Sequence, residues 1–229
     1  MLLSIIIPCF NEVNTIREVI KKIIDQDYIK KQIILVDDNS TDGTTNIIKN
    51  DLENIIDHVI YQKNNQGKGA AIQKALPYVK GDIVIIQDAD LEYNPADYKA
   101  LIEPIIHLKK EVVYGSRVLN KSRYRDTRFT SLYRVFFNHV LTTITNLLYG
   151  QKLTDAHTCY KLFVSSIIPK LKLVEKDFAF CPEFTAQISK LGIKIHEVPI
   201  SYNGRSYLEG KKIKMIDGLK ATKVLFKNY

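Results

Sequence analysis

The chain has 229 residues, 45% of them hydrophobic and 25% charged, which excludes a disordered chain and allows one sizeable core. Lysine and arginine outnumber aspartate and glutamate by 33 to 25. The net charge of +8 favours an anionic partner: nucleic acid, a phosphorylated ligand or an anionic membrane surface. The three cysteines are widely spaced and form no CxxC motif, so we expect reduced thiols in a cytosolic compartment.

The first residues carry no basic group and lead into Pro8, so we expect no secretory signal. No stretch reaches about 18 uncharged apolar residues, so no transmembrane helix is expected either.

Strands and helices are predicted to alternate along the first half of the chain. Apolar runs and turn residues predict strands over 3–8, 32–37, 58–62, 83–86 and 111–116, and helices over 14–24, 41–50, 67–79 and from Pro95. Asn14 or Thr15 is placed to cap the first helix, with Glu18 completing a capping box. This alternation predicts an α/β fold with a mainly parallel sheet and helices on both faces.

The composition changes after residue 117. Five basic residues precede or open an apolar, aromatic helix predicted over 132–149: Lys121, Arg123, Arg125, Arg128 and Arg134. Two interpretations of this helix stay open: an amphipathic segment lying on a membrane surface, or a core helix packed on the sheet. A helix near 182–190, a strand near 193–198 and a basic helix over 213–227 follow. Since no repeat or low-complexity linker divides the chain, we expect a single domain over 1–229.

Three carboxylates, Asp88, Asp90 and Glu92, directly follow the apolar strand predicted over 83–86. Open α/β sheets bind ligands at the carboxyl ends of their strands. In extended chain the three side chains would share one face, where a hard cation such as Mg²⁺ or Mn²⁺ would neutralise them. The alternative is three acids in a solvated loop.

Two earlier strands end in the same way. The first runs into Pro8 through Glu12, and the second into Val36 through Thr44, a segment that contains Asp37 and Asp38. A carboxylate at such a strand end can accept hydrogen bonds from a base or from ribose hydroxyls. Three strands with acidic ends therefore predict one nucleotide-binding crevice.

Several segments together resemble the family 2 glycosyltransferases of the GT-A fold, in particular the branch of dolichyl-phosphate mannose and polyprenyl-phosphate glucose synthases. The segments that carry the resemblance are 5–12 (IIIPCFNE), 36–44 (VDDNSTDGT), 67–71 (GKGAA), 88–90 (DAD), 115–117 (GSR) and 197–200 (EVPI). It implies a GT-A, Rossmann-like domain with a nucleotide-sugar-binding half over 1–117. The remainder, 118–229, would be an acceptor half with amphipathic interface helices.

The resemblance also implies roles for individual residues. Those that would hold the base and ribose are Pro8, Phe10, Glu12, Val36 and Asp38. Asp88 and Ala89 would line the ribose-phosphate, and Lys68 would lie near the donor. Asp90 and Glu92 would bind the metal, although many relatives have glutamine at the position of Glu92.

Arg117, Arg205 and Lys211 would stabilise the pyrophosphate, with the segment around 205–211 resembling a loop that closes over the donor. Asp155 lies in a segment that resembles the acceptor side. The resemblance implies transfer of a hexose, from a GDP-mannose or UDP-glucose type of donor, to a polyprenyl or dolichyl phosphate. The reaction would invert the donor's α configuration, and the enzyme would be peripheral at the inner face of the membrane.

Two other functions stay open: a transferase of the same fold acting on a soluble saccharide or protein, and a non-catalytic nucleotide-sugar-binding module. A nucleic-acid partner is not expected, because the acids are grouped where the ligand would sit. The sequence does not determine which sugar, nucleotide or lipid would be used. It also leaves open whether Mg²⁺ or Mn²⁺ would be bound, and the oligomeric state.

Overall fold

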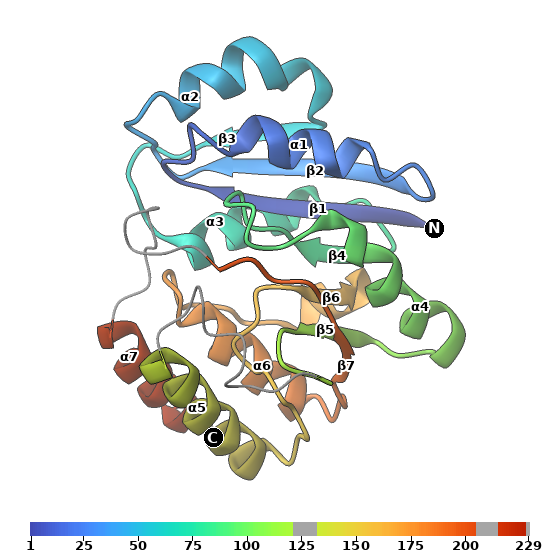
Figure 1. Ribbon diagram of the computed structural model, residues 1–229, viewed down its shortest axis with the longest axis vertical. Coiled ribbons are helices and arrows are strands. Elements are labelled where there is room, and N and C mark those ends of the chain that lie inside the picture. The colour runs from blue at the N-terminus through green and yellow to red at the C-terminus, as the bar shows by residue number, and fades with distance from the viewer. Residues whose placement is uncertain (121–131, 205–214, 228–229) are drawn as a thin grey trace.

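The computed structural model describes residues 1–120, 132–204 and 215–227 (Figure 1). Within them lies a seven-stranded sheet of order β3-β2-β1-β4-β6-β5-β7. Its strands are β1 (Leu2–Cys9), β2 (Lys30–Asp37), β3 (His58–Tyr61), β4 (Ile83–Ile86), β5 (Val112–Ser116), β6 (Lys161–Val164) and β7 (His196–Pro199). The predicted mainly parallel sheet is confirmed, but β6, which the sequence did not predict, runs antiparallel to both β4 and β5.

Helices cover both faces of the sheet, as expected. They are α1 (Ile16–Ile24), α2 (Thr44–Ile47), α3 (Lys68–Ala75), α4 (Tyr98–Leu108), α5 (Leu132–Tyr149), α6 (Phe180–Lys190) and α7 (Met215–Lys227). Alternate residues of β1 point to opposite sides. Ile5 and Ile7 pack in the core with α1 and α4, whereas Ile6 packs with α3 and α6. The continuous apolar run of β1 follows from this double burial.

Two helix predictions need correction. The helix predicted over 41–50 begins only at Thr44, after Gly43 with φ +100°, and continues from Ile48 to Leu52 as a π-helical turn. The helix predicted over 67–79 ends at Ala75 and gives way to a 3₁₀ turn at Leu76–Tyr78 that contains Pro77. A proline inside a helix removes a backbone donor and clashes with the preceding turn, which accounts for this end.

The capping box predicted for α1 is wrong. The helix starts at Ile16, and Thr15 makes no capping hydrogen bond. Its hydroxyl instead donates to the backbone oxygen of Ala89 at 2.7 Å and to Glu12 Oε2 at 2.9 Å. Thr15 therefore ties the loop after β1 to the loop after β4.

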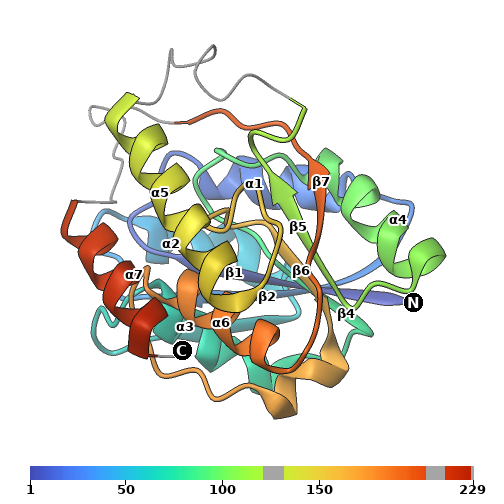
Figure 2. The same ribbon diagram turned by 90° about the horizontal axis from the view of Figure 1, so that it is seen from below.

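The apolar helix α5 packs against α6 and α7, beside the sheet rather than within its central layer (Figure 2). Leu141 of α5 is buried together with Ala221 and Leu225 of α7. The opposite side of α5 remains exposed, with Phe136 at 54% and Leu147 at 80%. None of the described helices is both long enough and apolar enough to cross a membrane.

Candidate active site

The loops that follow β2, β1 and β4 lie side by side, because these three strands are neighbours in that order. Hydrogen bonds join the loops directly: Asp38 N donates to Cys9 O at 2.8 Å, and Glu12 N donates to Thr44 Oγ1 at 2.8 Å. The predicted convergence of the three strand ends in one place is confirmed.

Asp38 organises the entry to α3. Its buried carboxylate accepts hydrogen bonds from Gln62 Nε2 at 2.7 Å, Gln66 N at 2.8 Å and Gly67 N at 2.7 Å. Burial raises the pKa of Asp38, and the two backbone donors oppose that rise. Asp38 thus fixes the loop that leads into Lys68, in addition to any contact it makes with a nucleotide.

The other residues predicted to hold the base and ribose differ in exposure. Pro8 and Phe10 are partly exposed at the end of β1, whereas Glu12 is buried and bonded to Thr15. Val36 is fully buried in the core on the α3 side. The Val36 side chain is therefore not accessible to a ligand in this structure.

Lys68 is the first residue of α3 and forms an ion pair with Asp88, which lies two residues after the end of β4. The two side chains are 10% and 14% exposed, respectively, so the pair is largely shielded from water. Lys68 Nζ also donates to Cys159 Sγ at 3.0 Å. The pairing places Lys68 beside the predicted ribose-phosphate position, as the resemblance implies.

Glycine is required next to Lys68 because another segment passes very close. A Cβ atom on Gly69 would lie 2.3 Å from the backbone oxygen of Glu175, and one on Gly67 would lie 2.6 Å from that of Lys176. Ala70 N donates to the same Lys176 oxygen at 2.9 Å. The segment 175–177 therefore holds the start of α3 in place.

The prediction that Asp88, Asp90 and Glu92 share one face of an extended chain is wrong. The chain turns after Ala89, and Leu91 adopts a left-handed conformation with φ +61°. Glu92 N donates to Asp90 Oδ1 at 3.0 Å across this turn. Within the described ranges, no three histidine, cysteine, aspartate or glutamate side chains are grouped so as to hold a metal ion.

Glu92 has a partner from the far end of the chain. Tyr202 donates its hydroxyl proton to Glu92 Oε2 at 2.7 Å, and its ring lies next to that of Tyr93 with centroids 5.3 Å apart. Tyr202 was not among the predicted site residues. It follows the 197–200 segment that carried part of the resemblance, which is the one sequence signal for it.

Arg117, which follows β5, is held by Asp155 from the loop before β6. Arg117 Nε donates to Asp155 Oδ2 at 2.7 Å and Nη2 to Oδ1 at 2.8 Å. Burial alone would raise the pKa of Asp155, but the Arg117 guanidinium outweighs it and keeps that pKa below its usual value. The guanidinium also lies over the Tyr202 ring, 5.1 Å from its centroid.

Glu197 of β7 positions the loop that carries Asp155. Its carboxylate accepts hydrogen bonds from Thr154 N at 2.7 Å and Asp155 N at 2.9 Å. Glu197, Asp155, Arg117 and Tyr202 thus form one connected network that ends at Glu92. Arg205 and Lys211, predicted to act with Arg117, lie outside the described residues.

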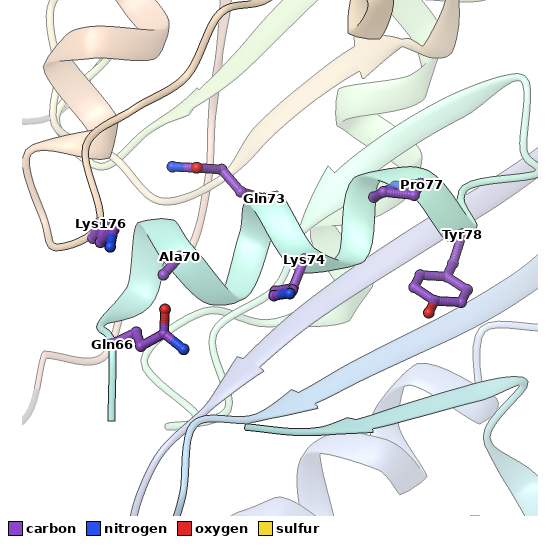
Figure 3. A pocket seen from close by; sticks show the side chains of 7 residues that line it. All are labelled: Gln66, Ala70, Gln73, Lys74, Pro77, Tyr78 and Lys176. Carbon is purple, nitrogen blue, oxygen red and sulfur yellow. The ribbon is translucent and has the colours of Figure 1, made fainter. Parts of the chain in front are cut away.

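A separate pocket of 440 Å³ runs along the outer side of α3 (Figure 3). It is lined by Gln66, Ala70, Gln73, Lys74, Pro77, Tyr78 and Lys176. None of the predicted site residues is among them.

The model of the family "Glycosyl transferase family 2" matches residues 4–171. The chain belongs to this family and is a glycosyltransferase with the GT-A fold. Two named relatives are similar to this chain over nearly all of its length. A UDP-N-acetylglucosamine–dolichyl-phosphate N-acetylglucosaminyltransferase of Methanococcus voltae is 31% identical, with 96% of this chain and 92% of the relative covered. A dolichyl-phosphate beta-glucosyltransferase of Trichomonas vaginalis is 28% identical, with 98% and 72% covered.

The fold is also that of glucosyl-3-phosphoglycerate synthase from Mycobacterium tuberculosis. A crystal structure of that enzyme with Mg²⁺ and UDP has a TM-score of 0.73 at 18% identity, over 99% of this chain and 78% of the other. The same enzyme has been crystallised with Mn²⁺ and UDP-glucose.

Proposed function

We propose that this glycosyltransferase moves a hexose from a nucleotide-diphosphate sugar to a polyprenyl or dolichyl phosphate. The observation that carries the proposal is the hydrogen-bonded joining of the loops after β1, β2 and β4, with Lys68 paired to Asp88 in the last of them and Arg117 packed on the Tyr202 ring that bonds Glu92. The names of the two relatives, both for transfer to dolichyl phosphate, support the acceptor class.

In the donor half, the loops that contain Phe10, Glu12 and Asp38 surround the position proposed for the base and ribose. Asp88 and Ala89 line the ribose-phosphate, and Lys68 neutralises negative charge beside them. A lysine held by a carboxylate in a shielded site is pre-oriented, so it needs little rearrangement when a phosphate arrives.

A divalent metal ion, Mg²⁺ or Mn²⁺, fits the turn after β4. Asp90 and Glu92 supply hard carboxylate oxygens from a single turn, and the hydrogen bond from Glu92 N to Asp90 Oδ1 orients one of them. When bound, the ion would neutralise the charge that builds up on the leaving nucleoside diphosphate. We therefore propose Asp90 as the principal ligand, assisted by Glu92.

The acceptor needs no protein base, because a lipid monophosphate is already anionic near neutral pH. Its oxygen attacks the anomeric carbon while the bond from that carbon to the nucleoside diphosphate breaks. Direct displacement of this kind inverts an α-linked donor to a β-linked product. Arg117, together with Arg205 and Lys211, would stabilise the departing pyrophosphate.

The exposed side of α5 supports action at a membrane surface. Phe136, Val140 and Leu147 follow one another at helical spacing, and all are exposed although large and apolar. Basic residues precede this helix in the sequence. We propose peripheral attachment at the inner, cytoplasmic face of the membrane through this side of α5.

A screen of nucleotide sugars against short-chain polyprenyl phosphates, read as released nucleotide and lipid-linked sugar, tests the proposal. The expected result is β-linked lipid product from one donor. If nucleotide is released only when a soluble saccharide or protein is supplied, the acceptor is that soluble molecule and not a lipid phosphate. Donor binding without any transfer would indicate a non-catalytic nucleotide-sugar-binding module.

A further inference from the structure

The pocket along the outer side of α3 has the size of a small-molecule site. Its volume is 440 Å³, and such sites usually measure about 300–1,000 Å³. Ala70, which is buried, lies between the longer and exposed side chains of Gln66 and Lys74, each four residues away from it. Lys176, from the segment before α6, lines the pocket at the same end of α3 as Gln66 (Figure 3). The pocket is thus built by two segments that are far apart in the chain.

The charge of this pocket is positive. Lys74 and Lys176 both line it, and none of the described residues that form its wall is acidic. The acidic residues on either side of Lys176 are instead paired with lysines of α7, Glu175 with Lys227 and Asp177 with Lys220. Two cationic side chains without an acidic neighbour in the wall favour an anionic ligand.

The rest of the wall is suited to hydroxyl groups and to a small apolar surface. Gln73 Nε2 donates to Glu175 O at 2.8 Å, which fixes the amide of this side chain. The amides of Gln66 and Gln73 can accept hydrogen bonds from hydroxyl groups. Pro77 and the ring of Tyr78 provide apolar surface, and that ring is packed against His58 with centroids 4.6 Å apart. This mixture matches a small polyhydroxylated molecule that carries an anionic group.

We propose that this pocket binds a small hydroxyl-bearing phosphomonoester, such as a sugar phosphate, through Lys74 and Lys176, and that its binding strengthens the binding of the donor's nucleotide. The first part stands on the pocket alone, and the second rests on the proposed function.

The link to the donor site follows from the backbone contacts of two residues that line the pocket. Gln66 N donates to Asp38 Oδ1 at 2.8 Å, and Lys176 O accepts a hydrogen bond from Ala70 N at 2.9 Å. Both contacts hold the start of α3, where Lys68 begins the helix. A ligand that touches both side chains joins the loop before α3 to the segment 175–177. Part of the ordering of this region then precedes nucleotide binding, so the nucleotide binds more tightly.

The test of the first part is calorimetric titration of the full-length protein with glucose 6-phosphate, with glucose as the uncharged comparison. Wild type should bind the phosphate and not glucose. The double variant Lys74→Gln, Lys176→Gln should bind it at least about tenfold more weakly, the scale of one charge-assisted contact. These changes leave the backbone oxygen of Lys176 in place, so the variant should melt as wild type does.

A second double variant, Lys21→Gln, Lys99→Gln, provides the matched control. It removes the same charge from exposed positions on α1 and α4, which pack on the other face of the sheet from α3. It should bind glucose 6-phosphate as wild type does.

The test of the second part is titration with UDP or GDP, whichever the accepted donor carries. Saturating glucose 6-phosphate should tighten nucleotide binding about fivefold, at the low end of typical coupling between sites. Because coupling of this kind is reciprocal, saturating nucleotide should tighten glucose 6-phosphate binding by the same factor. Both effects should disappear in the Lys74→Gln, Lys176→Gln variant.

Four results would contradict the first part: no binding of glucose 6-phosphate, equal binding of glucose, equal binding by the pocket variant, or competition with the nucleotide, which would place the phosphate in the donor site. Binding in the pocket without any effect on the nucleotide would overturn the second part. Binding in the pocket of a protein that binds no nucleotide and transfers no sugar would establish the pocket and contradict the proposed function. Sugar transfer by a protein that does not bind glucose 6-phosphate would do the reverse.

Discussion

Tyr202 and Glu92 are joined by a hydrogen bond of 2.7 Å from the tyrosine hydroxyl to Glu92 Oε2. The bond connects the segment after β7 to the turn after β4, so the two halves of the sheet meet at a proposed metal ligand. Arg117 lies over the same tyrosine ring. Tyr202 is therefore a positioning residue for groups on both sides.

Removing only the hydroxyl tests this role. Tyr202→Phe keeps the ring under Arg117 but leaves Glu92 without that donor, and we expect a loss of about 1–2 kcal/mol in the free energy of unfolding. Urea denaturation measures it. Tyr61→Phe is the control, because the Tyr61 hydroxyl makes only a long, solvent-exposed hydrogen bond of 3.4 Å to Glu53. Equal midpoints for the two variants would show that the Glu92 contact contributes nothing.

Asp90→Asn should remove most of the transferase activity while leaving the fold intact, because it takes one charge from the proposed metal site. Activity at saturating Mg²⁺ or Mn²⁺, thermal melting and the effect of EDTA provide the measurements. Asp82→Asn, at an exposed carboxylate before β4, should retain activity. Full turnover in EDTA would contradict a role for the metal.

Asp155→Asn should destabilise the protein strongly, since it leaves the largely buried Arg117 charge uncompensated. Breaking such a pair costs about 3–5 kcal/mol. The matched control is Asp51→Asn, whose pair with Arg17 is exposed and contributes about 0–1 kcal/mol at most. The pKa of Asp155 is lower in the folded protein than in the unfolded chain. The stability that Asp155 contributes is therefore fully present above its unfolded-state pKa and is lost as the pH falls through its folded-state pKa. Similar unfolding free energies for both variants would refute this difference.

His157 should make the fold sensitive to mild acid. Burial, followed by the charge of Lys161, lowers its pKa from 6.5 to about 4. The unfolded chain therefore binds a proton more readily than the folded one in that interval, and stability falls as the pH drops from 6.5 toward 4. Urea titrations of wild type and His157→Gln across this range measure the effect. If His157→Gln leaves the dependence of unfolding free energy on pH unchanged, His157 is not the source of that dependence.

Vesicle binding tests the exposed side of α5. Basic residues near anionic headgroups contribute about 1 kcal/mol each and are screened by salt. Wild type should therefore float with anionic vesicles at low salt, and binding should fall as salt rises. The double variant Phe136→Ser, Leu147→Ser should float less while melting normally, because both side chains are exposed. Leu108→Ser, at an exposed site on α4, is the control. Wild type that stays at the bottom of the gradient would remove this support for a lipid acceptor.

Local patterns were sufficient for the parts of the fold with strong apolar runs. The strands β1, β2 and β4 and the meeting of their carboxyl ends followed from sequence alone, as did the bounds of α5. The short strand β6 was missed because it begins with Lys161, and its burial depends on strands far away in the chain. The turn at Leu91 was missed because a leucine gives no sign of a left-handed backbone.

Side-chain partners were harder to predict than positions. Arg117 and Asp155 were both singled out, but their pairing depends on β6 lying between β4 and β5. Lys68 was placed near the donor, whereas its contact with Cys159 crosses between loops that no local pattern connects. The roles proposed for the site residues remain predictions until the variants are measured.

The reversed direction of β6 has a consequence for how this enzyme can be altered. For the parallel strands, the segment that follows each strand reaches the site. For the antiparallel β6, the segment that precedes the strand, 154–160, reaches the site instead. This segment supplies Asp155, His157 and Cys159, while the residues after Val164 emerge at the opposite edge of the sheet. Changes in specificity can thus be sought upstream of β6, without exchanging any strand.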